Sequence, residues 1–254
     1  GAEAQSPAWH VKTALVALGR EAGGRPAVTV RSPDRMTREE IDRADVILLA
    51  GVSQWGADVG DRVAARIRQG AGGVVFLGPS MKADAASDFF APSGRAMPPL
   101  IPIRIAERPA SPEWSALSDI DWRHPLLAPL QDNTFGDLLQ VRASAWRTLE
   151  WERAPESARV LARTADGTPW LLEAEAGRGR IVVLNTSAND AWTDLPRRRI
   201  FVPLLDRITR FAAGSLYADA QPTVDTPLRI PLREPEAPTE VTVRDPEGKD
   251  LPIQ

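Results

Sequence analysis

Residues 45–78 read DVILLAGVSQWGADVGDRVAARIRQGAGGVVFLG, and this stretch decides the fold class. Two continuously apolar runs, residues 46–50 and 74–77, have the length and composition of strands covered on both faces. The stretch between them repeats valine and isoleucine at helical spacing and ends at Gly70. A strand, a helix and a second strand in this order predict a crossover in a parallel sheet, so we expect a doubly wound α/β fold.

The alternation of helices and strands continues towards the amino terminus. Residues 11–18 repeat apolar side chains at helical spacing, and residues 27–30 read AVTV, which predicts a short strand. A doubly wound unit of this kind begins with a buried strand before its first helix, but residues 1–8 contain no apolar run. We therefore expect the first strand to lie upstream in the full-length protein. Its central slot is then open to another segment, such as residues 221–254 or a neighbouring molecule.

The second half of the chain turns to β structure before a last helix. Residues 159–163 and 170–173 flank the dipeptide Asp166-Gly167, which is a strong hairpin signal. Residues 177–179 read GRG between two apolar runs, so we interpret them as a second turn rather than a dinucleotide-binding loop. An amphipathic helix is expected to open at Pro196. A strand at residues 100–105 is also expected, with Pro102 restricting it to an edge.

Two segments follow from this pattern. Residues 6–213 are predicted to form one α/β domain. Residues 214–254 are proline-rich and are predicted to be a linker and the start of a β-sandwich-like segment, with short strands at 228–230, 241–243 and 251–253.

Composition excludes several classes of function. The chain has 31 Lys+Arg against 34 Asp+Glu and a net charge of −3, so it lacks the basic excess of nucleic-acid-binding proteins. It has no cysteine, which excludes thiolate nucleophiles, disulfides and thiolate metal sites. With only two histidines, we expect neither a metal nor a cofactor. No apolar run approaches the ~18 residues that a membrane-spanning helix needs.

One serine and one histidine are candidates for nucleophilic catalysis. Ser80 follows the apolar run 74–77, where a nucleophile elbow would place it. A serine nucleophile needs a base within hydrogen-bond reach, and His124 is the plausible base in this chain. The alternative is that His124 packs in a loop between Trp122 and Pro125 and takes no part in chemistry.

A polar cluster follows the apolar run 181–184 and is the candidate ligand site. Such side chains could hydrogen-bond a small polar ligand at the carboxyl edge of the sheet. They could equally form a turn in which they satisfy their own backbone. The members of the cluster are Asn185, Thr186, Ser187, Asn189, Asp190 and the aromatic Trp192.

The same region carries a family resemblance. Residues 177–196, GRGRIVVLNTSANDAWTDLP, followed by FVPLL at 201–205, resemble a hallmark of bacterial BatA-type membrane proteins. These aerotolerance-related proteins contain a von Willebrand A-type domain and a glutamine amidotransferase-like domain outside the cytoplasmic membrane. Residues 44–52, 72–78 and 165–170 are similar to that domain as well, and the resemblance covers roughly residues 6–213.

The resemblance implies a class I amidotransferase-like, flavodoxin-like fold, but the chain departs from its catalytic pattern. Active members place a cysteine after the strand matched by 74–77, where this chain has Ser80, and a histidine after the strand matched by 181–185, where it has none. The implied function is a non-catalytic, periplasmic scaffold or interaction domain. Segments outside this chain would anchor it to the cytoplasmic membrane, and its partners would be proteins or other domains of the same protein. The alternatives are a serine hydrolase using Ser80 and His124, and a carbohydrate or small-ligand module of the trehalose-utilisation-like type, which shares this fold.

Overall fold

The computed structural model describes residues 6–21, 27–91, 98–108, 113–151, 157–214, 216, 243–244 and 250–251. The chain divides into two compact units, residues 1–220 and 221–254. In the second unit β10 (Val243–Arg244) pairs antiparallel with β11 (Asp250–Leu251). The strands expected at 228–230, 241–243 and 251–253 lie wholly or partly outside the described residues.

A seven-stranded sheet in the order β1-β2-β9-β8-β7-β4-β5 is the centre of the first unit. The first three strands in this order run parallel, and the remaining strands pair antiparallel. Their bounds are β1 Val46–Ala50, β2 Gly72–Phe76, β9 Gly179–Leu184, β8 Pro169–Ala176, β7 Ala158–Thr164, β4 Ser115–Ser118 and β5 Arg142–Ala143.

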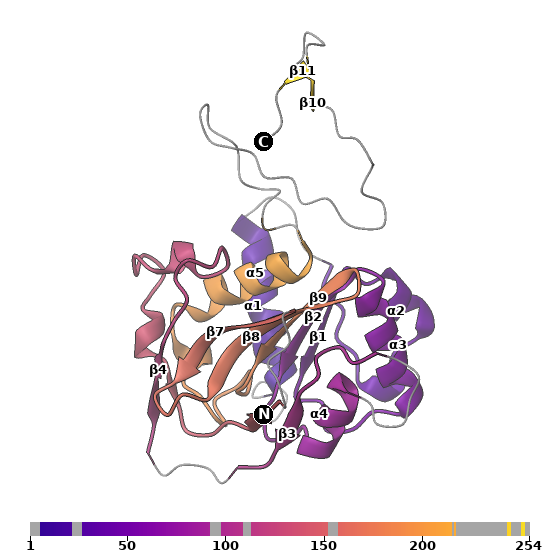
Figure 1. The fold of residues 1–254 in the computed structure, drawn as a ribbon, viewed down its shortest axis with the longest axis horizontal. Coiled ribbons are helices and arrows are strands. Elements are labelled where there is room, and N and C mark those ends of the chain that lie inside the picture. Colours follow the sequence, from indigo (N-terminus) through magenta and orange to yellow (C-terminus); the bar gives the residue numbers. More distant parts are fainter. Residues whose placement is uncertain are drawn as a thin grey trace. The chain divides into compact units, whose positions relative to one another are not determined.

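Helices cover both faces of this sheet (Figure 1). On one face lie α1 (Pro7–Glu21) and α5 (Phe201–Ala212), and on the other α2 (Arg38–Arg43), α3 (Ala57–Arg68) and α4 (Ala83–Phe90). Alternate residues of the strands contribute to two cores: Val74 and Val182 pack towards α5, whereas Val75 and Val183 pack towards α3 and α4. The predicted α/β architecture with a parallel strand–helix–strand unit is confirmed.

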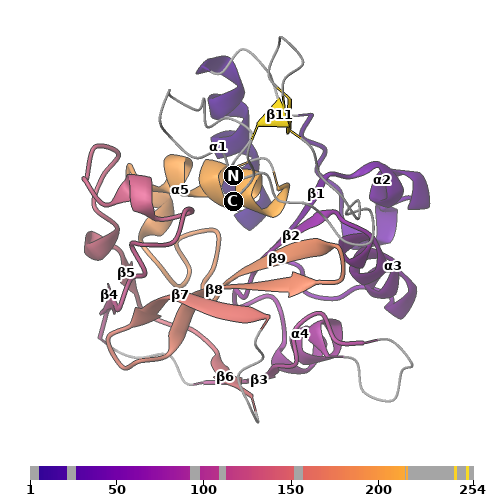
Figure 2. The ribbon, with the colours of Figure 1, turned by 45° about the horizontal axis from the view of Figure 1, so that its top comes forward.

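The remaining elements are short. Figure 2 shows β3 (Arg104–Ala106) and β6 (Thr148–Glu150) beside α4, where they form an antiparallel pair of their own. The 3₁₀ helices are η2 (Pro33–Arg35), η3 (Ala128–Leu130), η4 (Leu138–Gln140) and η5 (Leu195–Arg197). No helix among the described residues has both the length and the apolar character needed to cross a membrane.

Three expected elements differ from those observed. Residues 27–30 form neither a helix nor a strand, and in the described part of the chain β1 has β2 as its sole neighbour. The strand expected at 100–105 is reduced to β3, which begins after Pro102. The last helix starts at Phe201 rather than near Pro196, because Pro196 lies in the separate 3₁₀ turn η5.

Both predicted turns are present. Gly167 has a φ of 85° and closes the β7–β8 hairpin, a conformation that glycine adopts without strain. Gly177 has a φ of 62° and joins β8 to β9. Since the Arg178 N–H donates to the Arg68 carbonyl at 2.8 Å, this second turn rests directly on the end of α3.

Candidate functional site

The two loops with candidate chemistry meet at the carboxyl edge of the parallel strands. Phe76 at the end of β2 pairs with Leu184 at the end of β9, and the Leu77 N–H donates to the Leu184 carbonyl at 2.9 Å. Just beyond, a Cβ added to Gly78 would lie 3.3 Å from the Cβ of Ser187. The loop carrying Ser80 and the polar cluster after β9 are therefore neighbours, as their positions in the sequence suggested.

Asn185 is buried, and its side chain is fully used within the protein. Its Oδ1 accepts from the backbone N–H of Arg147 at 2.8 Å. Its Nδ2 donates to the carbonyls of Arg147 and Pro169, both at 2.9 Å. An amide with one acceptor and two donors engaged in this way has little capacity left for a ligand. Asn185 therefore ties the chain before β6 and the start of β8 to the end of β9.

The next residues form a turn that satisfies its own backbone. The Ser187 hydroxyl donates to the Asn189 carbonyl at 2.7 Å and accepts from the Trp192 N–H at 3.0 Å. The Asn189 Oδ1 accepts from the Ala191 N–H at 3.3 Å. The hydroxyl of Thr186 is buried and has no hydrogen-bond partner among the described residues. These contacts match the alternative in which the cluster is a turn.

The side chains of Asp190 and Trp192 each contact an arginine outside the turn. Asp190 pairs with Arg197, and the hydrogen bond from that guanidinium holds the pKa of Asp190 below its ordinary value. Trp192 is half-buried, and the Arg147 guanidinium lies 4.8 Å from its ring centroid, a cation–π geometry.

Arg147 is the central residue of this edge. It is 4% exposed, and burial lowers the pKa of its guanidinium. One nitrogen donates to the Met81 carbonyl at 2.7 Å, and another pairs with Glu107. Because Met81 directly follows Ser80, the guanidinium packs against the loop that carries Ser80.

The structure does not bring Ser80 and His124 together as a catalytic pair. Ser80 is exposed in the loop after β2. His124 is buried on the face covered by α5, where its ring meets Phe211 edge-on at 5.1 Å between centroids. Its Nε2 lies 2.9 Å from Glu173 Oε1, and its Nδ1 accepts from the Leu126 N–H at 3.3 Å. Both ring nitrogens are engaged, so His124 has no free lone pair to act as a base for Ser80.

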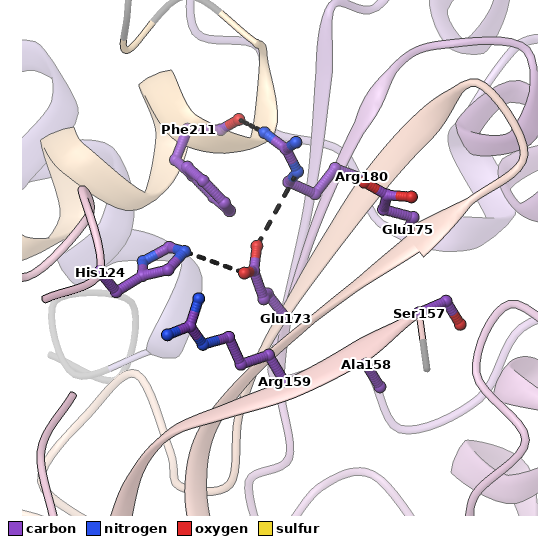
Figure 3. A pocket seen from close by; sticks show the side chains of 8 residues that line it. All are labelled: His124, Ser157, Ala158, Arg159, Glu173, Glu175, Arg180 and Phe211. Atoms are coloured by element: carbon purple, nitrogen blue, oxygen red, sulfur yellow. Dashed lines mark hydrogen bonds and ion pairs between the residues drawn. The ribbon is translucent and has the colours of Figure 1, made fainter. Parts of the chain in front are cut away.

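His124 instead lines a hollow of about 270 Å³ at the opposite edge of the sheet (Figure 3). Here β7 and β9 begin and β8 ends. The Arg180 Nε lies 3.9 Å from Glu173 Oε2, and its guanidinium stacks over the Phe211 ring at 4.2 Å. Arg159, which is about half exposed, pairs with Asp121 at 2.5 Å. The lining residues are His124, Ser157, Ala158, Arg159, Glu173, Glu175, Arg180 and Phe211.

No protein-family model matches the chain, and no curated protein sequence matches it. Solved structures are similar in fold. A cytoplasmic protein from Salmonella typhimurium LT2 has a TM-score of 0.57 at 15% identity, over 83% of this chain and 86% of that one. A ThuA-like protein from Bacteroides uniformis has a TM-score of 0.51 at 14% identity, over 79% and 82%. A β-galactosidase from Rahnella sp. R3 reaches 0.52 at 16% identity over 80% of this chain, which corresponds to 26% of the enzyme.

These likenesses confirm the predicted flavodoxin-like, glutamine amidotransferase-like fold. At this level of identity they carry no activity from one protein to another. The function must therefore be inferred from the two ends of the strands in this chain. At the carboxyl end lies the buried Arg147, and at the opposite end lies a polar hollow. Among the described residues, no three or more histidines and carboxylates are grouped to hold a metal ion.

Sequence reasoning missed the residues that matter most at both edges. Arg147 lies in an irregular stretch, and its partners Met81 and Glu107 are distant in sequence, so no local pattern marks it. Glu173 does leave a signal, because it is a carboxylate in the middle of an apolar strand, WLLEAEA. Such a side chain is costly to bury unless it has partners, which here are His124 and Arg180.

Proposed function

We propose that this chain is a non-catalytic interaction domain in which the amidotransferase-like site has become structural. The observation that carries this proposal is the buried Arg147 guanidinium beside the loop of Ser80, held by Met81 and Glu107. The polar residues that follow β9 are committed to backbone contacts, Asn185 and Ser187 above all. The edge that would hold reacting groups instead holds the loops together.

The two candidate bases for this chemistry, His124 and Glu107, are both engaged elsewhere. Acyl transfer needs a nucleophile activated by an adjacent base. His124 does not serve Ser80, since it is bonded to Glu173 on the face covered by α5. The carboxylate near the Ser80 loop, Glu107, is paired with Arg147 and accepts from the Ala83 N–H at 3.2 Å.

Two further observations favour a role in binding other proteins. Trp9 and Val16 lie on α1 with 40% and 42% of their surface exposed. They are seven residues apart and therefore share one side of this helix. The resemblance of residues 177–205 to BatA-type proteins supports a periplasmic location, anchored to the cytoplasmic membrane by segments outside this chain. The partner would then be another domain of the same protein or a second protein.

The proposal predicts no hydrolytic turnover. Wild-type protein and the Ser80→Ala variant should release equal, background amounts of ammonia from glutamine and of nitrophenolate from p-nitrophenyl acetate, because no base activates the serine. Steady-state assays at equal protein concentration measure both. Turnover by the wild type that Ser80→Ala abolishes would overturn the proposal and favour the serine hydrolase.

A second candidate function is the binding of a small polyhydroxylated ligand, and the hollow at the opposite edge favours it. Arg159 offers donors, whereas Glu173, Glu175 and the Ser157 hydroxyl offer acceptors, and hydroxyl groups of a sugar can use both. The volume of about 270 Å³ suits one sugar ring rather than a large ligand. The sequence predicted a carbohydrate or small-ligand site in the loop after β9, whereas this hollow lies at the opposite end of the strands.

Calorimetric titration with glucose and with trehalose tests this candidate. If the hollow binds either sugar, Arg159→Ala should weaken binding about tenfold through the loss of one charged hydrogen bond of ~1.5 kcal/mol. Ser80→Ala at the other edge is the matched control and should bind like the wild type. An absence of binding heat at millimolar sugar, or equal affinity in Arg159→Ala, would contradict it.

A further inference from the structure

The hollow at the start of β9 has two glutamates on one face of β8 (Figure 3). Glu173 and Glu175 are two residues apart in this strand, so their side chains lie on the same face. The alanines that alternate with them are buried in the core on the other face. The strand register places an arginine opposite each glutamate: Arg159 of β7 pairs with Glu173, and Arg180 of β9 pairs with Glu175.

The side chains of these charged residues do not pair as the register would suggest. Arg159 forms its ion pair with Asp121, at 2.5 Å. Arg180 turns towards the end of α5, where its Nη1 donates to the Phe211 carbonyl at 3.4 Å and its guanidinium lies over the Phe211 ring. The carboxylate with which Arg180 pairs is that of Glu173, at 3.9 Å. Both arginines are therefore turned away from the second glutamate of β8.

Glu175 is the carboxylate that this arrangement leaves over. It is exposed at the rim of the hollow, and within the part of the chain that the structure describes its carboxylate has no ion pair or hydrogen bond. Its backbone N–H donates to the Ser157 carbonyl at 2.9 Å, which places Ser157 beside it at the same rim. A carboxylate and a hydroxyl group thus lie next to each other where a ligand can reach both.

The groups around the hollow carry an excess of one negative charge. Its two arginines are matched by the carboxylates with which they pair, and Glu175 remains. His124 adds no positive charge, because its Nδ1 accepts from the Leu126 N–H at 3.3 Å and therefore carries no proton. A neutral sugar would leave this negative charge unpaired. A sugar with one ammonium group would pair it through a charge-assisted hydrogen bond.

We propose that the hollow selects an amino sugar over a neutral sugar, and that Glu175 binds its ammonium group. The Ser157 hydroxyl and the N–H groups of Arg159 that do not face Asp121 are then partners for hydroxyl groups of the ring. Replacing one hydroxyl by an ammonium group leaves the ring the same size, so the volume of about 270 Å³ suits both sugars equally. This inference rests on the second candidate function above and specifies its ligand.

Calorimetric titration with glucosamine and with glucose tests this selection, at about pH 6, where an amine of this kind carries its proton. The two sugars differ in a single group on the ring, so the difference in affinity reports the ammonium group alone. The variant Glu175→Gln keeps the shape of the side chain and removes its charge. The matched control is Glu39→Gln, which removes an equal charge from an exposed site on α2, on the other face of the sheet.

We expect the wild type to bind glucosamine about fivefold more tightly than glucose, which is the upper range for an ion pair at an exposed site. Glu175→Gln should bind the two sugars equally, and Glu39→Gln should keep the preference of the wild type. Glucosamine bound no more tightly than glucose, or a preference that survives in Glu175→Gln, would overturn the inference while the hollow still counts as a sugar site. If neither sugar binds, the second candidate function fails, and the inference fails with it.

Discussion

Replacing Asn185 with alanine should lower the free energy of unfolding by about 3–5 kcal/mol, because three buried backbone groups lose their partner at once. These groups are the N–H and C=O of Arg147 and the C=O of Pro169. Asn185 is buried, so water does not replace the lost bonds without a local opening. Urea unfolding followed by tryptophan fluorescence measures the effect.

Asn189→Ala is the matched control within the same loop. Its side-chain contact to the Ala191 N–H is 3.3 Å long and exposed, so the expected loss is below about 1 kcal/mol. If the cluster were instead a ligand site, Asn185→Ala would keep its stability and lose binding. Equal unfolding midpoints for Asn185→Ala and the wild type would therefore contradict the structural interpretation.

Gly179→Ala should destabilise the protein by about 3 kcal/mol or more, because the added methyl group has no room. Its Cβ would lie 1.9 Å from the Ile67 carbonyl oxygen and 2.4 Å from that of Ala71. Both are backbone atoms at the junction between α3 and β2, so relief requires moving the turn away from the helix. The melting temperature, measured by circular dichroism, is expected to fall accordingly.

Gly56→Ala serves as the control for Gly179→Ala. An added Cβ at Gly56 meets nothing within 4 Å, and the φ of −63° suits any residue. Its cost should stay below about 1 kcal/mol, as for a changed helix N-cap. Equal melting temperatures for Gly179→Ala and Gly56→Ala would contradict the description, because they would mean that the turn at residues 177–179 does not pack against the end of α3.

The parallel core was predictable because its signals are local. β1, α3 and β2 each carry their own periodicity, and the hairpin at Gly167 has its turn dipeptide. The start of α2 is local in the same way, because it is a capping box: the Glu40 N–H donates to the Thr37 hydroxyl, and the Thr37 N–H to the Glu40 carboxylate.

What could not be predicted depends on partners distant in sequence. Residues 27–30 have strand propensity, but a strand requires a neighbour, and the described part of the chain supplies none. The last helix was expected to open at Pro196. The Asp194 carboxylate, two residues earlier, accepts from the Arg142 N–H at 2.8 Å and from Arg198 at 2.9 Å, and the helix begins at Phe201.

The candidate site also combines a local sequence signal with contacts to residues distant in sequence. Asn, Ser and Asp after a strand predicted either a ligand site or a turn, since both use these residue types. In the structure Asn185 and Ser187 bond to groups of the protein itself, and the partners of Asn185 are too distant in sequence to be predicted from it. The role of Arg147 could not be predicted, because the sequence does not indicate which of its many arginines is buried.

The unfolding free energy of Arg147→Ala tests the central claim most directly, namely that the carboxyl edge is held closed rather than kept for chemistry. The closed edge predicts a loss of about 2–3 kcal/mol, because the buried Met81 carbonyl loses its donor and Trp192 loses the stacked guanidinium. The half-exposed Arg159→Ala is the control and should lose less than about 1 kcal/mol. An Arg147→Ala variant as stable as the wild type, or more stable, would contradict the account, because a charge kept for binding or catalysis costs stability instead of supplying it.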